Sequence, residues 1–217
     1  MDTQARGTGV QGAGLRERKK LETARSIWAA AIGLFTEHGF DNVSVAQIAE
    51  AANVSKMTVF NYYATKEELI LRPLEEHVDE PASLMCKGLA GSSSLRPLRE
   101  FTLAAIAKRD PIVGMSASPQ VLEMERLVRS TSALDNLRTA HLRNSEEQMA
   151  AVLSGRMSDV VARLAGTLIV STLRTLRAEN VRALLDGATP DEINDQAVAN
   201  ANVAFDILER GLAPHFH

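Results

Sequence analysis

Apolar residues recur at intervals of three and four along most of the chain, the pattern of helices with one buried face. One such stripe runs from about Arg16 to His38, and Gly39 ends the helix. Its apolar positions are Ala24, Ile27, Trp28, Ala31, Leu34 and Phe35. Strand-like alternation and hairpin signals are absent from the sequence, so we predict an all-α protein of about nine helices.

Two short helices follow this first helix, separated by a tight break. Ser44 stands at the N-cap position of the first short helix, and Ser55 at that of the second. The apolar face of the first is formed by Val45, Ile48, Ala49 and Ala52. Asn53 lies at the break, and asparagine tolerates a positive φ better than any residue except glycine. The break is therefore predicted to be the corner of a helix-turn-helix.

The second short helix carries side chains that a soluble protein normally keeps inside. Val54 and Val59 can point back toward the preceding helix, with Thr58 at the boundary. The outward set is then Lys56, Met57, Phe60 and Asn61. In a DNA major groove lysine meets guanine or phosphate, methionine and phenylalanine meet thymine methyls, and asparagine meets adenine. The alternative is that these residues pack against another helix as ordinary core.

The rest of the chain is also predicted to be helical. Thr65 caps a further helix whose first turn is acidic, and Pro73 is predicted to kink or divide it. After Pro81 we expect helices near 95–109, 119–130, 132–153, 157–185 and 190–211.

Charge is unevenly distributed along the 217 residues. The formal net charge is -3, yet Arg16 to Arg25 holds five basic residues against two acidic ones. Residues 1 to 72 hold nine basic and eight acidic residues, a net charge of +1, so the remainder carries -4. This distribution fits a DNA-binding N-terminal domain followed by a mildly acidic C-terminal region. The alternative is that the basic run is only a solvated helix end.

Candidate chemistry is sparse. The single cysteine, Cys86, excludes an internal disulfide, and neither a signal peptide nor an apolar run long enough to span a membrane is visible, so we predict a cytoplasmic protein. HExxH, Walker, GxSxG and CxxC motifs are absent, and the five histidines have no ligand spacing. We therefore predict no catalytic residue, no metal site, no cofactor and no membrane partner, although a small helical enzyme stays open as a remote alternative.

One stretch resembles a known family. The pattern AxxLFxxxGF followed by SVAQIAEAANVSKMTVFNYYATKEEL is similar to the DNA-binding domain of the tetracycline-repressor (TetR) family of bacterial transcription regulators. The resemblance covers about Leu21 to Leu71. It implies a helix-turn-helix domain over residues 16–72 and a helical ligand-binding and dimerisation domain over 73–217. Residues 1–15, rich in glycine and small polar residues, are predicted to be a flexible tail.

The resemblance also implies roles for the residues of the motif. Phosphate contacts are implied for Ser44, Thr58, Tyr62 and Lys66, and base contacts for Lys56, Met57 and Phe60. With the cap Ser55 and the outward Asn61, these residues form the predicted DNA-binding set. Asn53 replaces the usual glycine, and Phe60 replaces a frequent tyrosine, which removes one hydroxyl contact. Tyr63 is expected to pack between helices.

The last two helices resemble the dimerisation helices of the family. Val160 to Leu173 contains only Arg163 as a charge, so this helix is predicted to be covered on more than one side. The next helix has a stripe of Ile193, Ala197, Ala201, Ala204, Phe205, Leu208 and Leu212. We expect helices 157–185 and 190–211 to pair with a second copy in a homodimer that binds a near-palindromic operator. The alternative is a thick monomeric core.

The helices between these parts resemble the variable ligand domain of the family. His141 and Ser145 are polar positions on an apolar stripe, and Phe101 and Met149 are predicted to line the same pocket for an unknown small-molecule effector. The alternative is a hydrogen-bonded core histidine. The function implied is a repressor released by the effector. A regulator controlled by a protein partner, or an activator, is the alternative.

Overall fold

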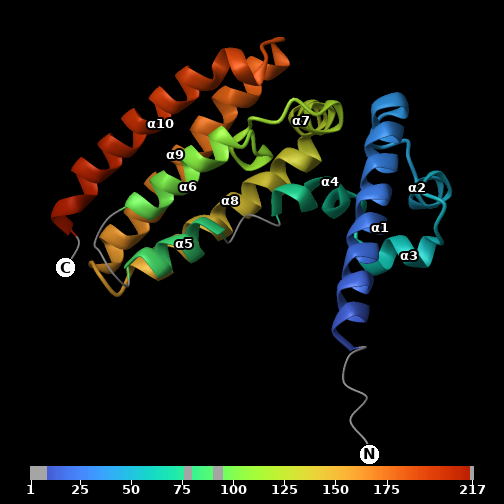
Figure 1. The fold of residues 1–217 in the computed structure, drawn as a ribbon, viewed down its shortest axis with the longest axis horizontal. Coiled ribbons are helices and arrows are strands. Elements are labelled where there is room, and N and C mark those ends of the chain that lie inside the picture. Colours follow the sequence, from blue (N-terminus) through green and yellow to red (C-terminus); the bar gives the residue numbers. More distant parts are fainter. Residues whose placement is uncertain (1–8, 76–79, 90–94, 216–217) are drawn as a thin grey trace, which may run out of the picture. The chain divides into compact units, whose positions relative to one another are not determined.

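The computed structural model describes residues 9–75, 80–89 and 95–215. These ranges contain ten α-helices, two short 3-10 helices and no strand (Figure 1). The all-α prediction is confirmed, with one helix more than expected. The chain divides into two compact units, Met1–Ile70 and Leu71–His217, while the sequence predicted a boundary after residue 72.

The helices of the N-terminal region follow the predicted order. They are α1 (Gly9–His38), α2 (Val45–Ala51), α3 (Lys56–Tyr62) and α4 (Lys66–Glu75). Helix α1 begins before the predicted start at Arg16, since each residue added to an existing helix gains a backbone hydrogen bond without a new nucleus. Residues 1–8 of the predicted tail lie outside the described residues. Helix α4 passes through Pro73 and ends at Glu75.

The core of the first unit joins α1, α2 and α3. Ile27 and Phe35 of α1, Ile48 of α2 and Val59 of α3 are all buried. Asn53 between α2 and α3 has a φ of 53°, so the predicted positive φ at this corner is confirmed. The core and the corner together hold α3 against the two helices that precede it.

The second unit is a bundle of longer helices. It comprises α5 (Glu80–Leu89), α6 (Arg96–Ala107), η1 (Pro111–Val113), α7 (Pro119–Ser130), α8 (Ser132–Leu153), α9 (Asp159–Leu185), α10 (Pro190–Leu212) and η2 (Ala213–His215). Helices α7 and α8 have the predicted bounds. Helix α5 was not predicted, and Pro81 lies near its start. It is the second residue of α5, and proline is tolerated in a first helical turn.

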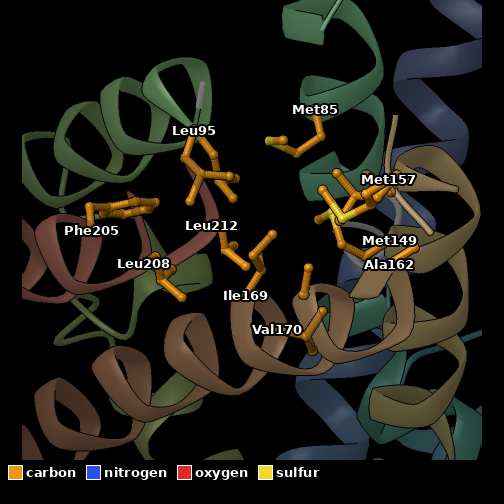
Figure 2. Packing of buried hydrophobic residues seen from close by; sticks show 14 residues of the cluster. Met85, Leu95, Met149, Met157, Ala162, Ile169, Val170, Phe205, Leu208 and Leu212 are labelled. Atoms are coloured by element: carbon orange, nitrogen blue, oxygen red, sulfur yellow. The ribbon is translucent and has the colours of Figure 1, made fainter. Parts of the chain in front are cut away.

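The core of this unit lies between α5, α6, α8, α9 and α10 (Figure 2). Met149 of α8, Ile169 of α9 and Phe205 of α10 are buried in it. Gly166 lets α9 approach α8 closely, since a Cβ there would lie 2.8 Å from the carbonyl oxygen of Glu146. None of the described helices contains an apolar stretch of the length that a membrane span requires.

Candidate nucleic-acid interface and ligand cavity

The two predicted caps start α2 and α3. The backbone N–H of Gln47 donates to Ser44 Oγ at 3.3 Å, and the N–H of Ser44 donates to Gln47 Oε1 at 2.9 Å, which completes a capping box. The N–H of Thr58 donates to Ser55 Oγ at 3.0 Å. Both caps satisfy backbone groups that the first turn leaves without partners, so the start of each short helix is well defined.

Helix α3 presents one apolar and amide surface to solvent. Met57 is 68% exposed and Phe60 is 44% exposed, and Lys56 and Asn61 are also exposed. Val59, on the opposite side, is buried. The alternative in which the outward residues are ordinary core is therefore wrong for the free chain. We call Lys56, Met57, Phe60 and Asn61 the α3 surface.

The remaining residues around α3 lie at its edge or behind it. Thr58 and Tyr62 are half-buried at the boundary. Tyr63 is buried, and its hydroxyl donates to the carbonyl oxygen of Ala24 at 3.1 Å. This bond joins the end of α3 to α1 and confirms that Tyr63 packs between helices. Lys56 Nζ lies 5.8 Å from the centroid of the Phe60 ring, within cation–π range.

Lys66 has partners within the chain that the sequence did not predict. Its ammonium donates to the carbonyl oxygens of Phe40 at 2.6 Å and Val43 at 3.2 Å. It also lies 4.3 Å from the centroid of the Phe40 ring. These two bonds leave one of the three ammonium N–H groups for the implied phosphate contact, which stays a prediction. In the free chain Lys66 ties the start of α4 to the connection between α1 and α2, because that connection offers carbonyl oxygens that a cation can satisfy.

Replacing Lys66 with methionine is expected to lower the free energy of unfolding of the first unit by about 1–3 kcal/mol, since two hydrogen bonds to a charged group are lost. Urea unfolding monitored by circular dichroism would measure the loss. Lys56→Met, at an exposed position, is the control and should change stability little. If Lys66 served only to contact a phosphate, Lys66→Met would leave stability unchanged and would instead lower the salt dependence of DNA binding by about one unit of slope.

The second unit contains a cavity of about 140 Å³ with largely apolar walls. Its lining includes Pro81, Ala82, Leu98, Phe101, Thr102, Ile106, Ile112, Val113, Leu142, Ser145, Met149, Val170, Leu173, Arg174, Leu176, Arg177 and Asn180. Three of the four predicted ligand residues, Phe101, Ser145 and Met149, therefore lie together. His141 does not line the cavity: it lies one turn before Ser145, whose hydroxyl donates to the His141 carbonyl oxygen at 3.1 Å.

The polar wall of the cavity was missed by the sequence analysis. It consists of Arg174, Arg177 and Asn180, three residues apart along α9. That spacing within a mostly apolar helix was the available signal. Arg177 forms an ion pair with Glu125 of α7, whose side chain is almost fully buried.

The short helix η1 packs against α9 at the polar wall of the cavity. Asn180 Nδ2 donates to the carbonyl oxygen of Val113 at 2.8 Å. Gly114 has a φ of 73°, and a Cβ at this position would lie 2.5 Å from the carbonyl oxygen of Arg177. The backbone of η1 therefore lies directly on α9, and the cavity wall made by η1 depends on that close approach.

An exposed apolar face runs along α9 and α10. It comprises Val160, Leu164 and Leu168 of α9 and Val203 and Ile207 of α10, all more than half exposed. We call these five residues the α9–α10 face. Leu168 lies seventeen residues before the end of α9, and Ile207 seventeen residues after the start of α10. The antiparallel hairpin therefore brings these two residues to the same level.

The predicted stripe on the last helix has a different role. Ala197, Ala201, Phe205, Leu208 and Leu212 are buried within the single chain. They form part of its own core, because α10 packs this stripe against α6 and α9. The large apolar residues left exposed on α10 are Val203 and Ile207.

Comparisons with known proteins agree with this geometry. The family model for bacterial regulatory proteins of the tetR family matches residues 27–72. The HTH-type transcriptional regulator TcmR of Streptomyces glaucescens is 32% identical over 168 residues, which cover 76% of this chain and 70% of TcmR. The putative mycofactocin biosynthesis transcriptional regulator MftR of Mycobacterium tuberculosis is 37% identical over 68 residues, 31% of this chain and 34% of MftR.

Solved structures share the fold. NalD, the secondary repressor of the MexAB-OprM multidrug efflux pump in Pseudomonas aeruginosa, aligns with a TM-score of 0.53 and 18% identity over 86% of this chain and 97% of NalD. The SmeT–triclosan complex aligns with a TM-score of 0.54 and 15% identity over 90% of this chain and 92% of SmeT. At these identities the likeness concerns the fold alone.

Proposed function

Since the chain belongs to the TetR family of bacterial regulatory proteins and is a DNA-binding transcriptional regulator rather than an enzyme, we propose that it is a homodimeric repressor. It binds a near-palindromic operator in the bacterial cytoplasm and is released when a small-molecule effector occupies the cavity. The observation that carries this proposal is the α3 surface, where large apolar side chains are exposed in the free chain.

The α3 surface has the chemistry needed to read a major groove. The ammonium of Lys56 can donate to guanine or phosphate, the thioether of Met57 and the ring of Phe60 can contact thymine methyls, and the amide of Asn61 can pair with adenine. Ser44, Ser55, Thr58 and Tyr62 supply hydroxyl groups for phosphates. Base readers in the centre and phosphate contacts at the rim give both sequence preference and register.

A second copy of the chain is the proposed partner of the α9–α10 face. An apolar surface of this kind on a helix pair is costly in water, and packing it on its own copy across a two-fold axis buries both surfaces. The two α3 surfaces of such a dimer would enter successive major grooves about 34 Å apart. This is the reason for expecting a near-palindromic operator.

The cavity favours a regulator that a small molecule releases from DNA, rather than one controlled by a protein partner. Its walls are apolar with a few polar groups, the usual composition of a small-molecule site. NalD is a repressor and SmeT forms a complex with triclosan, and both support the same kind of regulation here. An effector needs to favour the released conformation by only about 1–3 kcal/mol.

The base-reading role of the α3 surface is tested by selecting preferred sequences from a random DNA pool and measuring them by gel shift across a salt series. Lys56→Ala and Met57→Ala are each expected to cost about 1–3 kcal/mol at particular base pairs and to relax preference there. Binding by the unaltered protein should weaken steeply with salt. Lys108→Ala, an exposed lysine of the second unit, is the control. If both α3 variants kept the base preferences of the unaltered protein at every position, Lys56 and Met57 would not be base-reading residues.

A further inference from the structure

The charged groups that line the cavity are all cationic. Arg174 and Arg177 are the charged residues among the described lining side chains, and no aspartate or glutamate is among them. Arg177 is neutralised by its ion pair with Glu125. Arg174 has no hydrogen-bond or ion-pair partner within the part of the chain that the structure describes. The lining therefore retains one uncompensated positive charge.

The other polar groups of the lining already donate most of their hydrogens. The hydroxyl of Thr102 donates to the carbonyl oxygen of Leu98 at 2.8 Å, and the hydroxyl of Ser145 donates to that of His141. The side-chain amide of Asn180 donates one of its two N–H groups to the carbonyl oxygen of Val113. A ligand that enters the cavity must therefore satisfy its polar end chiefly with guanidinium donors.

We propose that the effector is a compact, mostly apolar monoanion whose carboxylate is bound by Arg174. The guanidinium presents planar donors that match a carboxylate in a two-point contact. The side chains of Leu98, Phe101 and Met149 enclose the apolar body. This inference rests on the proposed effector role of the cavity and adds the chemical class of the effector.

Arg174, rather than Arg177, is the group that takes the anion. An anion that displaced Glu125 from Arg177 would leave the buried Glu125 carboxylate without a partner, which is strongly unfavourable. Arg174 is exposed and loses no existing ion pair when it binds a carboxylate. The positive charge on the lining matches a single negative charge on the ligand.

The test compares head groups on two fixed apolar bodies. Octanoate and 3-phenylpropanoate, the corresponding amides, and the primary amines of the same length are titrated into the full-length protein by isothermal titration calorimetry. Each acid is expected to bind about 2- to 5-fold more tightly than its amide, the effect of one charge pair whose arginine is exposed, and each amine to bind weakest.

Arg174→Gln should remove the preference for acid over amide while leaving amide affinity and the melting temperature nearly unchanged. The matched control is Arg163→Gln, since Arg163 is exposed on the same helix, about 16 Å away along its axis, and does not line the cavity. This control variant should keep the preference for the acid.

The possible results test two claims separately: that the effector is an anion, and that the cavity is the effector site. Amides that bind as tightly as acids, or an acid preference that survives Arg174→Gln, would overturn the anionic class and leave the cavity as the effector site. Absence of binding by all six compounds would overturn both the class and the site. DNA binding, measured separately by gel shift, would then show whether the regulator assignment still stands.

Discussion

Replacing Leu164 and Ile207 together with glutamate is expected to convert the proposed dimer to a monomer and to weaken operator binding by roughly 100- to 10,000-fold. Both side chains lie on the α9–α10 face and are more than half exposed in the single chain, so neither supports the fold of its own subunit. Two carboxylates per subunit would meet their symmetry copies in an apolar interface, where unpaired charges are costly. A monomer then binds one half-site without the gain in affinity from a linked second site.

Sedimentation velocity and gel shift measure the two parts of this result. Asn136→Glu with Asn144→Glu is the matched control, because it adds the same charge at two exposed positions of α8 outside the α9–α10 face. The control protein should stay dimeric and bind the operator. A dimer that persists in the Leu164 and Ile207 variant would show that the α9–α10 face is not the interface.

Replacing Glu125 with alanine is expected to lower the free energy of unfolding by about 3–5 kcal/mol. Glu125 is only 2% exposed, and the side chain of its partner Arg177 is 20% exposed. Removing one member of a buried ion pair leaves the other charge desolvated and unpaired. Urea unfolding at one fixed protein concentration measures the loss, since the stability of a dimer depends on concentration.

Two further variants distinguish the effect of losing the ion pair from general effects of substitution. Glu123→Ala, on the same helix, removes a carboxylate whose pair with Arg126 is far more exposed, and should cost less than about 1 kcal/mol. Replacing both Glu125 and Arg177 with methionine should recover most of the stability, because no charge is left unpaired. Equal losses in Glu123→Ala and Glu125→Ala would contradict the importance of burial for this pair.

Local features of the fold were predictable because their causes lie within a few residues. The bounds of α7 and α8 follow from apolar periodicity, and the starts of α2 and α3 from the caps Ser44 and Ser55. The positive φ of Asn53 follows from its side chain. The exposure of the α3 surface was also predictable, because Val59 orients the short helix toward the core.

The sequence by itself thus determined the helical class, most helix ends, the helix-turn-helix corner and the residues that α3 displays. Tertiary structure alone decided the engagement of Lys66 with the carbonyls of Phe40 and Val43, and the pairing of Arg177 with Glu125, 52 residues away. It also decided that Phe205 lies in the core of its own chain while Ile207 stays uncovered. Periodicity shows that a helix has an apolar face, but which neighbour covers that face, and which distant carboxylate or carbonyl meets a cation, depends on how the helices pack.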